Sequence, residues 1–181
     1  MNLPNLLSLA RLIASAPAFW AILEGRFTLA LILLLLAGVS DVLDGVLARR
    51  RRQVTRLGAY LDPVADKLLL SGSYLALGMA GVAPGWLVAI VLGRDALILL
   101  AVGAALAFSS LREFPPSAWG KTSTVVQVVT GVTLLASAAC PWPWLGQFAA
   151  FLVWLTAAAT LWSGLDYAIG MLARLRRLDA A

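Results

Sequence analysis

The sequence has no histidine, a single cysteine and few charged residues. Only 13% of its 181 residues are charged, whereas 61% are hydrophobic; in a soluble domain about a quarter are charged. Without histidine, acid–base chemistry must rest on carboxylates, Lys or Tyr. A metal ion must then be held by oxygen ligands, which favours hard cations such as Mg²⁺, Mn²⁺ or Ca²⁺. The lone Cys140 excludes an intrachain disulfide.

So large an excess of apolar residues cannot be buried inside one small globule, and the composition predicts an integral membrane protein. The net charge of +5 could suggest nucleic-acid binding. Most of the basic residues, however, flank apolar runs, where Lys and Arg more often report membrane topology and contact anionic lipid. We therefore expect the lipid bilayer as a partner, and no nucleic acid.

Turn residues and charges divide the chain into six apolar runs, each long enough to cross a hydrocarbon core about 30 Å thick. We expect an all-α fold with six transmembrane helices near residues 8–23, 27–51, 57–80, 85–109, 119–139 and 145–173. Lys and Arg concentrate in the second and fourth connections and in the C-terminal tail; the other connections contain Arg26 alone. This alternation predicts cytoplasmic termini. Because no repeat or linker interrupts the sequence, we expect the chain to be a single membrane domain, 1–181.

The first apolar run opens with NLPNLLSLAR, in which Asn2, Asn5, Ser8 and Arg11 recur three positions apart. A polar stripe on an apolar helix is typical of an interfacial segment, here leading into the first span. The letters LIASAPA look like a signal-peptide cleavage site, but no positive region precedes them and Arg11 interrupts the apolar part. We expect this segment to be retained.

The seven tryptophans lie mostly near the ends of the expected spans. Trp86, Trp142 and Trp144 are expected on the outer side, in the aromatic belt of the membrane interface. Trp162 lies deeper in its run, and we expect it to pack inside the bundle.

Four aspartates interrupt the second and third apolar runs, on either side of a basic turn. The residues expected to share one helix face are Asp41, Asp44, Gly45 and Ala48 on the second helix and Gly58, Asp62 and Asp66 on the third. One charged side chain in hydrocarbon costs at least about 2.5 kcal/mol, so crowded carboxylates need protons, arginines or divalent cations to neutralise them. The small residues leave space beside the acids, which favours a bound ligand over a lattice of Asp–Arg pairs.

Such a group of aspartates, on two antiparallel neighbouring helices, can hold two divalent cations. Two magnesium ions about 3.5–4 Å apart bind the attacking and leaving oxygens in phosphoryl transfer, and a nearby arginine pairs with phosphate oxygens. The pattern therefore predicts a site for Mg²⁺ (or Mn²⁺) that acts on a phosphate ester at the cytoplasmic surface of the membrane.

The spacing of these residues resembles the signature of the CDP-alcohol phosphatidyltransferase family. The pattern Asp41-x2-Asp44-Gly45-x2-Ala48-Arg49-x8-Gly58-x3-Asp62-x3-Asp66 matches every defining position of that signature. The resemblance implies a multi-pass homodimeric enzyme of the cell inner membrane, with its active site facing the cytoplasm. Such an enzyme transfers a phosphatidyl group from CDP-diacylglycerol to an acceptor hydroxyl and releases CMP.

The resemblance also implies a role for each residue of the motif. Asp41, Asp44 and Asp62 would ligate the two cations, and Asp66 would be both a shared ligand and the general base. The residues implied in CDP-diacylglycerol binding are Gly45, Ala48, Arg49, Thr55 and Gly58. A carboxylate base agrees with the absence of histidine, because a carboxylate is one of the groups that can then take the acceptor's proton.

The acceptor must be recognised by residues outside this motif. The candidates are cationic groups near the expected cytoplasmic ends of the third to fifth helices: Lys67, Arg94, Arg112 and Lys121. Arg94 and Asp95 lie inside an apolar run, where a charged pair is costly unless it is used. For Lys67 and Lys121, a side chain that merely snorkels at a helix end is an equally good explanation. Cations at these positions suit an acceptor that carries a phosphate.

Other stretches resemble the glycerophosphate branch of the family. LDPVADKLLL, GKTSTVVQVV and TLWSGLDY are similar to enzymes that make phosphatidylglycerol phosphate, which puts glycerol 3-phosphate first among the acceptors. The branch also contains single-domain cardiolipin synthases, which use phosphatidylglycerol, and the Arg94-Asp95 pair is more like theirs. An ion or proton pathway is a further hypothesis, but it needs coordinating residues in both halves of the membrane, and the outer halves hold almost none.

Overall fold

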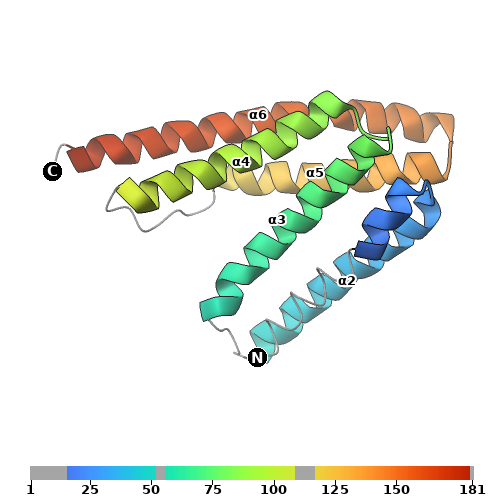
Figure 1. The fold of residues 1–181 in the computed structure, drawn as a ribbon, viewed down its shortest axis with the longest axis horizontal. Coiled ribbons are helices and arrows are strands. Elements are labelled where there is room, and N and C mark those ends of the chain that lie inside the picture. The colour runs from blue at the N-terminus through green and yellow to red at the C-terminus, as the bar shows by residue number, and fades with distance from the viewer. Residues whose placement is uncertain (1–15, 52–55, 109–116, 180–181) are drawn as a thin grey trace.

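The computed structural model describes residues 16–51, 56–108 and 117–179, and their side chains over 16–40, 67–101, 103–104 and 117–173. All the regular structure in these ranges is helical. After a helical segment at 16–23 come α2 (Phe27–Arg51), α3 (Arg56–Met79), α4 (Gly85–Phe108), α5 (Ala118–Ala139) and α6 (Pro143–Asp179) (Figure 1). Where the structure describes them, the expected helix limits agree to within two residues, except that α6 continues to Asp179. The expected start of the first helix, at residue 8, lies outside the described residues. The predicted interfacial segment lies outside the described residues.

Local sequence explains where these helices begin and end. Gly25 and Gly81 adopt positive φ angles of 73° and 72° in the turns before α2 and α4, a conformation that favours glycine. The Ser117 hydroxyl accepts a hydrogen bond from the Gly120 amide at 3.0 Å and so caps the start of α5. Pro143 is the first residue of α6, where its missing N–H costs nothing.

The helices pack around the antiparallel pair α5 and α6 (Figure 1). α4 lies along α6, α2 packs on α5, and α3 contacts both α4 and α5. α2 and α3 run antiparallel as expected, obliquely to the other three helices. Over the described residues, however, they make no close contact with each other. α5 contacts both of the helices that carry the aspartates, and a cavity lies between the three. That the acidic stripes of α2 and α3 face each other stays a prediction, because the side chains of residues 41–66 are not described.

Small residues let α3 and α4 approach closely, and buried apolar side chains form the core around them. A Cβ atom on Gly78 would lie 2.8 Å from Cγ2 of Val88, so the contact between α3 and α4 needs a glycine there. Tyr74, Leu87 and Leu135 are completely buried in this core. Such close contacts between small residues are typical of helix packing in membranes.

A seam of buried polar side chains joins α5 to α6. Its members are Ser123, Gln127, Thr130, Thr156, Thr160 and Ser163. The Thr130 and Thr156 hydroxyl oxygens are 2.6 Å apart, and Gln127 Nε2 donates to Thr160 Oγ1 at 2.9 Å. In lipid there is little hydrophobic drive for helices to associate, so hydrogen bonds of this kind contribute to holding them together.

Within the described part of the chain, two stretches are long and apolar enough to cross a membrane by length and composition, Ala118–Ala139 and Pro143–Ala173. Large apolar side chains are also exposed on the other helices, among them Leu36, Met79 and Leu100. These features agree with a membrane protein, while the full set of six spans stays a prediction.

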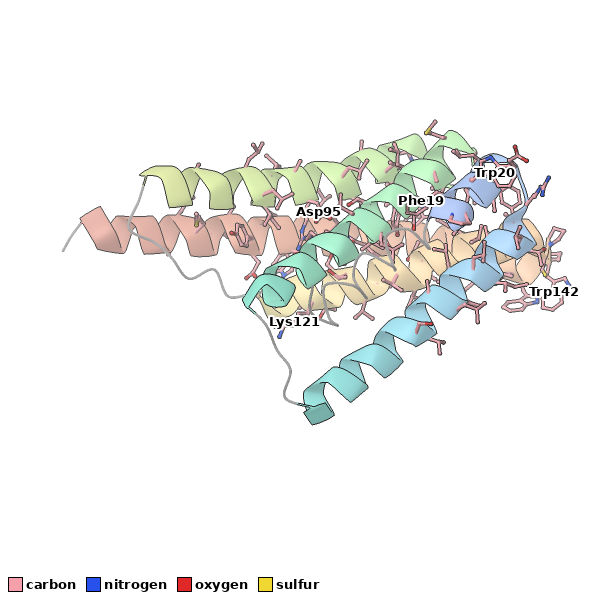
Figure 2. All side chains as sticks on the ribbon, turned by 60° about the horizontal axis from the view of Figure 1, so that its bottom comes forward. Phe19, Trp20, Asp95, Lys121 and Trp142 are labelled. Atoms are coloured by element: carbon pink, nitrogen blue, oxygen red, sulfur yellow. The ribbon has the colours of Figure 1, made fainter. Side chains whose placement is uncertain are left out.

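Two of the tryptophans expected on the outer side lie together at one end of the bundle, whereas Trp162 departs from its expectation. Trp142 and Trp144 lie with their ring centres 5.9 Å apart at the α5–α6 connection, the end where Trp20 also lies (Figure 2). Trp162 is 54% exposed and meets Trp119 edge to face, with ring centres 6.0 Å apart. The expectation that Trp162 packs inside the bundle is wrong, because the inward positions of α6 are taken by the small polar residues of the seam.

Candidate functional site

The four aspartates of the motif lie on two helices, as expected. Asp41 and Asp44 are in α2, and Asp62 and Asp66 are in α3. Helical backbone at these spacings places the members of each pair on one face. The described side chains contain no group of three or more metal-ligating residues, but those of the four aspartates are not among them. That the carboxylates converge on metal ions therefore stays a prediction.

The other residues of the motif follow the same pattern. Gly45, Ala48 and Arg49 belong to α2 and Gly58 to α3, all with side-chain positions outside the described set. Thr55 lies outside the described residues altogether. Pro63 stands inside α3 between two of the aspartates without ending the helix, as proline can in membrane-spanning helices.

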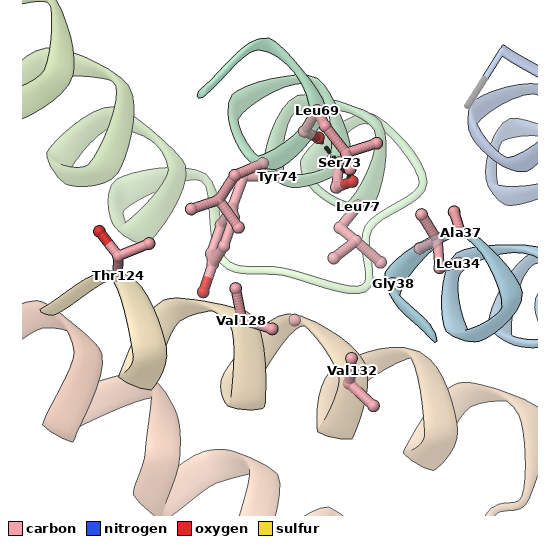
Figure 3. A pocket seen from close by; sticks show the side chains of 12 residues that line it. Leu34, Ala37, Gly38, Leu69, Ser73, Tyr74, Leu77, Thr124, Val128 and Val132 are labelled. Atoms are coloured by element: carbon pink, nitrogen blue, oxygen red, sulfur yellow. Dashed lines mark hydrogen bonds between the residues drawn. The ribbon is translucent and has the colours of Figure 1, made fainter. Parts of the chain in front are cut away.

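A cavity of about 300 Å³ lies between α2, α3 and α5 (Figure 3). Among its lining residues, Gly38 is one turn before Asp41 in α2, and Leu70 is one turn after Asp66 in α3. The cavity therefore adjoins the aspartate-bearing stretches of both helices. The Tyr74 ring forms part of the wall, and its hydroxyl donates to the Gln127 carbonyl of α5 at 2.9 Å. Leucine, valine and alanine make up most of the remaining lining.

A buried carboxylate holds two of the predicted acceptor cations together. Asp95 Oδ1 accepts hydrogen bonds from Lys67 Nζ of α3 and, at 2.7 Å, from Nη1 of the neighbouring Arg94. Asp95 Oδ2 accepts from the Ser71 hydroxyl at 3.4 Å. The Asp95 and Arg94 side chains are 6% and 9% exposed, whereas that of Lys67 is 37% exposed. Figure 2 shows Asp95 among the helices.

Arg94 also connects α4 to α5 and α6. Its Nη2 donates to Ser163 Oγ at 2.6 Å, and a Cβ atom on Gly120 would lie only 3.4 Å from the same nitrogen. The guanidinium therefore sits beside the first turn of α5, where the helix dipole adds partial positive charge. Its Nε is buried and has no hydrogen-bond partner among the described residues. Two cations and a helix N-terminus surround a single carboxylate, so the cluster is locally positive.

The remaining two predicted acceptor cations differ from this pair. Lys121 follows Gly120 in α5, but it is exposed and its amine points away from the bundle (Figure 2). Arg112 lies outside the described residues. The sequence indicated Asp95 only as a neighbour of Arg94, and it contained no signal for Ser163 or Ser71 as partners, since these contacts join separate helices.

Comparison with known proteins identifies the family. The family model for CDP-alcohol phosphatidyltransferase matches residues 1–162. A CMP-forming cardiolipin synthase of Streptomyces coelicolor is 36% identical over 100% of this chain and 87% of its own length. The CDP-diacylglycerol–glycerol-3-phosphate 3-phosphatidyltransferase of Bacillus subtilis is 31% identical over 92% of this chain and 93% of its own. The chain therefore belongs to the CDP-alcohol phosphatidyltransferase family, and it is an enzyme of that class.

Proposed function

We propose that the enzyme transfers the phosphatidyl group of CDP-diacylglycerol to the free hydroxyl of phosphatidylglycerol, forming cardiolipin and CMP. From the motifs alone glycerol 3-phosphate comes first. Phosphatidylglycerol moves ahead of glycerol 3-phosphate as the candidate acceptor because the relative that matches the whole chain at 36% identity is named a cardiolipin synthase. This observation carries the proposal. Glycerol 3-phosphate is the second candidate, supported by the Bacillus subtilis relative.

In the proposed reaction, the acceptor oxygen attacks the phosphorus nearer the diacylglycerol. The bond from that phosphorus to the oxygen of CMP breaks, and CMP leaves. The acceptor's proton passes to the carboxylate of Asp66, since the chain has no histidine to take it. A carboxylate positioned in this way contributes typically 10²–10⁴-fold to the rate.

The donor set of the motif fits a pair of hard cations, because it consists of carboxylates on two helices and no nitrogen or sulfur ligand. Asp41, Asp44, Asp62 and Asp66 would hold two ions, Mg²⁺ or Mn²⁺. When bound, such ions neutralise the diphosphate and the charge that develops on the leaving phosphate.

The cavity beside the motif suits a lipid donor. It begins one turn from Asp41 and Asp66, and its lining is mostly apolar, so an acyl chain can occupy it while the diphosphate lies at the aspartates. Contacts to the cytidine and phosphates are assigned to the remaining motif residues: Gly45, Ala48, Arg49, Thr55 and Gly58. Lys67 and Arg94 are assigned to the acceptor's phosphate, with Arg112 and Lys121 as further acceptor contacts.

We place the enzyme in the cytoplasmic membrane as a homodimer of six-span subunits, with its termini and active site on the cytoplasmic side. Two of the three tryptophans of α6, Trp144 and Trp162, support this depth. From Trp144 to Trp162 the helix rises about 27 Å, close to the hydrocarbon thickness of about 30 Å. Arg94 bonds to Ser163, the residue after Trp162, which supports a cation cluster at the level of the inner headgroups.

The purified enzyme in lipid nanodiscs tests this function. CDP-diacylglycerol is supplied with labelled phosphatidylglycerol or labelled glycerol 3-phosphate, with Mg²⁺ or with EDTA, and both CMP and lipid products are measured. We expect Mg²⁺-dependent CMP release with stoichiometric cardiolipin from phosphatidylglycerol. Phosphatidylglycerol phosphate as the main product would select the second candidate. Equal CMP release with Mg²⁺ and with EDTA would contradict the proposed metal requirement.

A further inference from the structure

Asp95 is the one described carboxylate that is almost fully buried, and each of its oxygens is used. Oδ1 binds Lys67 and Arg94, and Oδ2 accepts from Ser71. The two cations come from different helices, α3 and α4, and Lys67 directly follows Asp66 in the chain. The carboxylate therefore fixes the acceptor cations relative to each other and to the part of α3 that carries the proposed base.

The charges of this cluster do not balance. Among the described side chains, Lys67 and Arg94 contribute two positive charges and Asp95 one negative charge, which leaves one positive charge shared between the buried guanidinium and the partly exposed Lys67 amine. Arg94 adds an Nε that is buried and unpaired among the described residues. A buried charge without a partner is costly, so the cluster favours an anion, and its local charge matches a singly charged group.

We propose that Asp95 is the positioning and charge-setting residue of the acceptor site: it holds Lys67 and Arg94 together and leaves one positive charge, which favours a singly charged phosphodiester acceptor over a doubly charged phosphomonoester. This inference rests on the proposed function. It differs from a purely structural ion pair between α3 and α4, which would affect folding and both substrates alike.

A series of charge variants tests the proposal in full-length enzyme in nanodiscs. Lys67→Gln lowers the cluster charge by one, Asp95→Asn raises it by one, and Asp95→Glu keeps it. Arg26→Gln and Glu24→Gln make the same changes of charge at the exposed turn before α2 and serve as matched controls. Arg26 lies over the Trp20 ring, which is at the end of the bundle, away from Asp95 (Figure 2). For each variant, KM and kcat are measured for the donor and for the acceptor that is turned over. The other acceptor is measured as a competitive inhibitor.

We expect Asp95→Asn to reduce the preference for phosphatidylglycerol over glycerol 3-phosphate by about tenfold or more, as for a change in a buried charge pair. The KM for CDP-diacylglycerol should stay within about twofold, a change too small to indicate a lost donor contact. Asp95→Glu should restore most of the preference, and both controls should match the wild type. Lys67→Gln should weaken both acceptors and leave the donor KM unchanged.

An unchanged acceptor preference in Asp95→Asn, or equal rises in donor and acceptor KM, would overturn the inference. If Asp95→Asn fails to elute as a folded species in size-exclusion chromatography, the inference is tested with Lys67→Gln and Asp95→Glu instead. An unaltered acceptor affinity in Lys67→Gln, or a donor KM that rises in parallel in either variant, then overturns it. Failure of the proposed function is recognised separately, because the wild type would then release no CMP from CDP-diacylglycerol with either acceptor.

Discussion

Asp66 and Lys67 are adjacent in α3, yet they are assigned to different partners. Successive residues on a helix point about 100° apart, so Asp66 can serve the proposed metal site while Lys67 reaches Asp95 on α4. A single turn of α3 can in this way present a base for the acceptor's hydroxyl and a cation for its phosphate. Placing both groups on one rigid element keeps their separation constant during the reaction.

The proposed role of Asp66 as general base can be separated from its role as a metal ligand by replacing it with a near-isosteric amide. We expect Asp66→Asn to lower CMP release by about 10²–10⁴-fold, because the amide cannot accept the acceptor's proton. Cation binding, measured by isothermal titration, should weaken but stay detectable, since three carboxylates remain. Glu24→Gln, which removes a carboxylate from an exposed turn, is the control. Wild-type turnover in Asp66→Asn would exclude Asp66 as the base.

At the scale of elements, the α2–α3–α5 cavity predicts a separate effect on the lipid donor. A Cβ atom on Gly38 would meet nothing within 4 Å, so Gly38→Leu can fold and fill part of the cavity. We expect the KM for CDP-diacylglycerol to rise about tenfold, the effect of losing roughly two buried methylene groups. The acceptor KM should not change.

The matched control for this substitution is Gly103→Leu, at an exposed position of α4 that is also open. Kinetics with donors of different acyl length give a second readout. Short-chain CDP-diacylglycerol should be less sensitive to Gly38→Leu than the long-chain form. Equal donor KM values in the two glycine variants would contradict the proposal that the donor's acyl chain binds in this cavity.

The polar seam between α5 and α6 predicts a loss of stability with little effect on chemistry. Thr156→Val removes the hydrogen bond to Thr130 from a site with no exposed surface. We expect a loss of about 1 kcal/mol, seen as a Tm in detergent lower by about 2–4 °C. Thr133→Val is the control, because its hydroxyl bonds to the Val129 carbonyl of its own helix. Equal Tm values for the two variants would contradict a stabilising seam.

At the scale of the whole molecule, the single cysteine reports the topology. Cys140 is exposed in the connection between α5 and α6, which the proposed arrangement places outside the cytoplasm. We expect a membrane-impermeant maleimide to label it in intact spheroplasts. The control combines Cys140→Ser with Ala181→Cys at the C-terminus and should be labelled only after lysis. The opposite labelling pattern would invert the topology.

Features that depend on neighbouring residues along the chain could be predicted from the sequence. The helix limits follow from turn residues and caps such as Gly25, Gly81 and Ser117, and the spacing from Asp41 to Asp66 identified the family. Composition alone indicated a membrane protein, because no small soluble core can bury 61% of 181 residues.

The faces on which the helices meet became evident only from their packing. Lys67 and Asp95 are 28 residues apart, and Arg94 and Ser163 are 69 apart, yet each pair forms a hydrogen bond. The same packing turned Trp162 outward and opened a cavity between α2, α3 and α5. The physical reason is that lipid is as apolar as leucine, so hydrophobic periodicity does not mark the buried face of a membrane helix. Small residues and a few polar contacts select that face, and they act only once the helices are together.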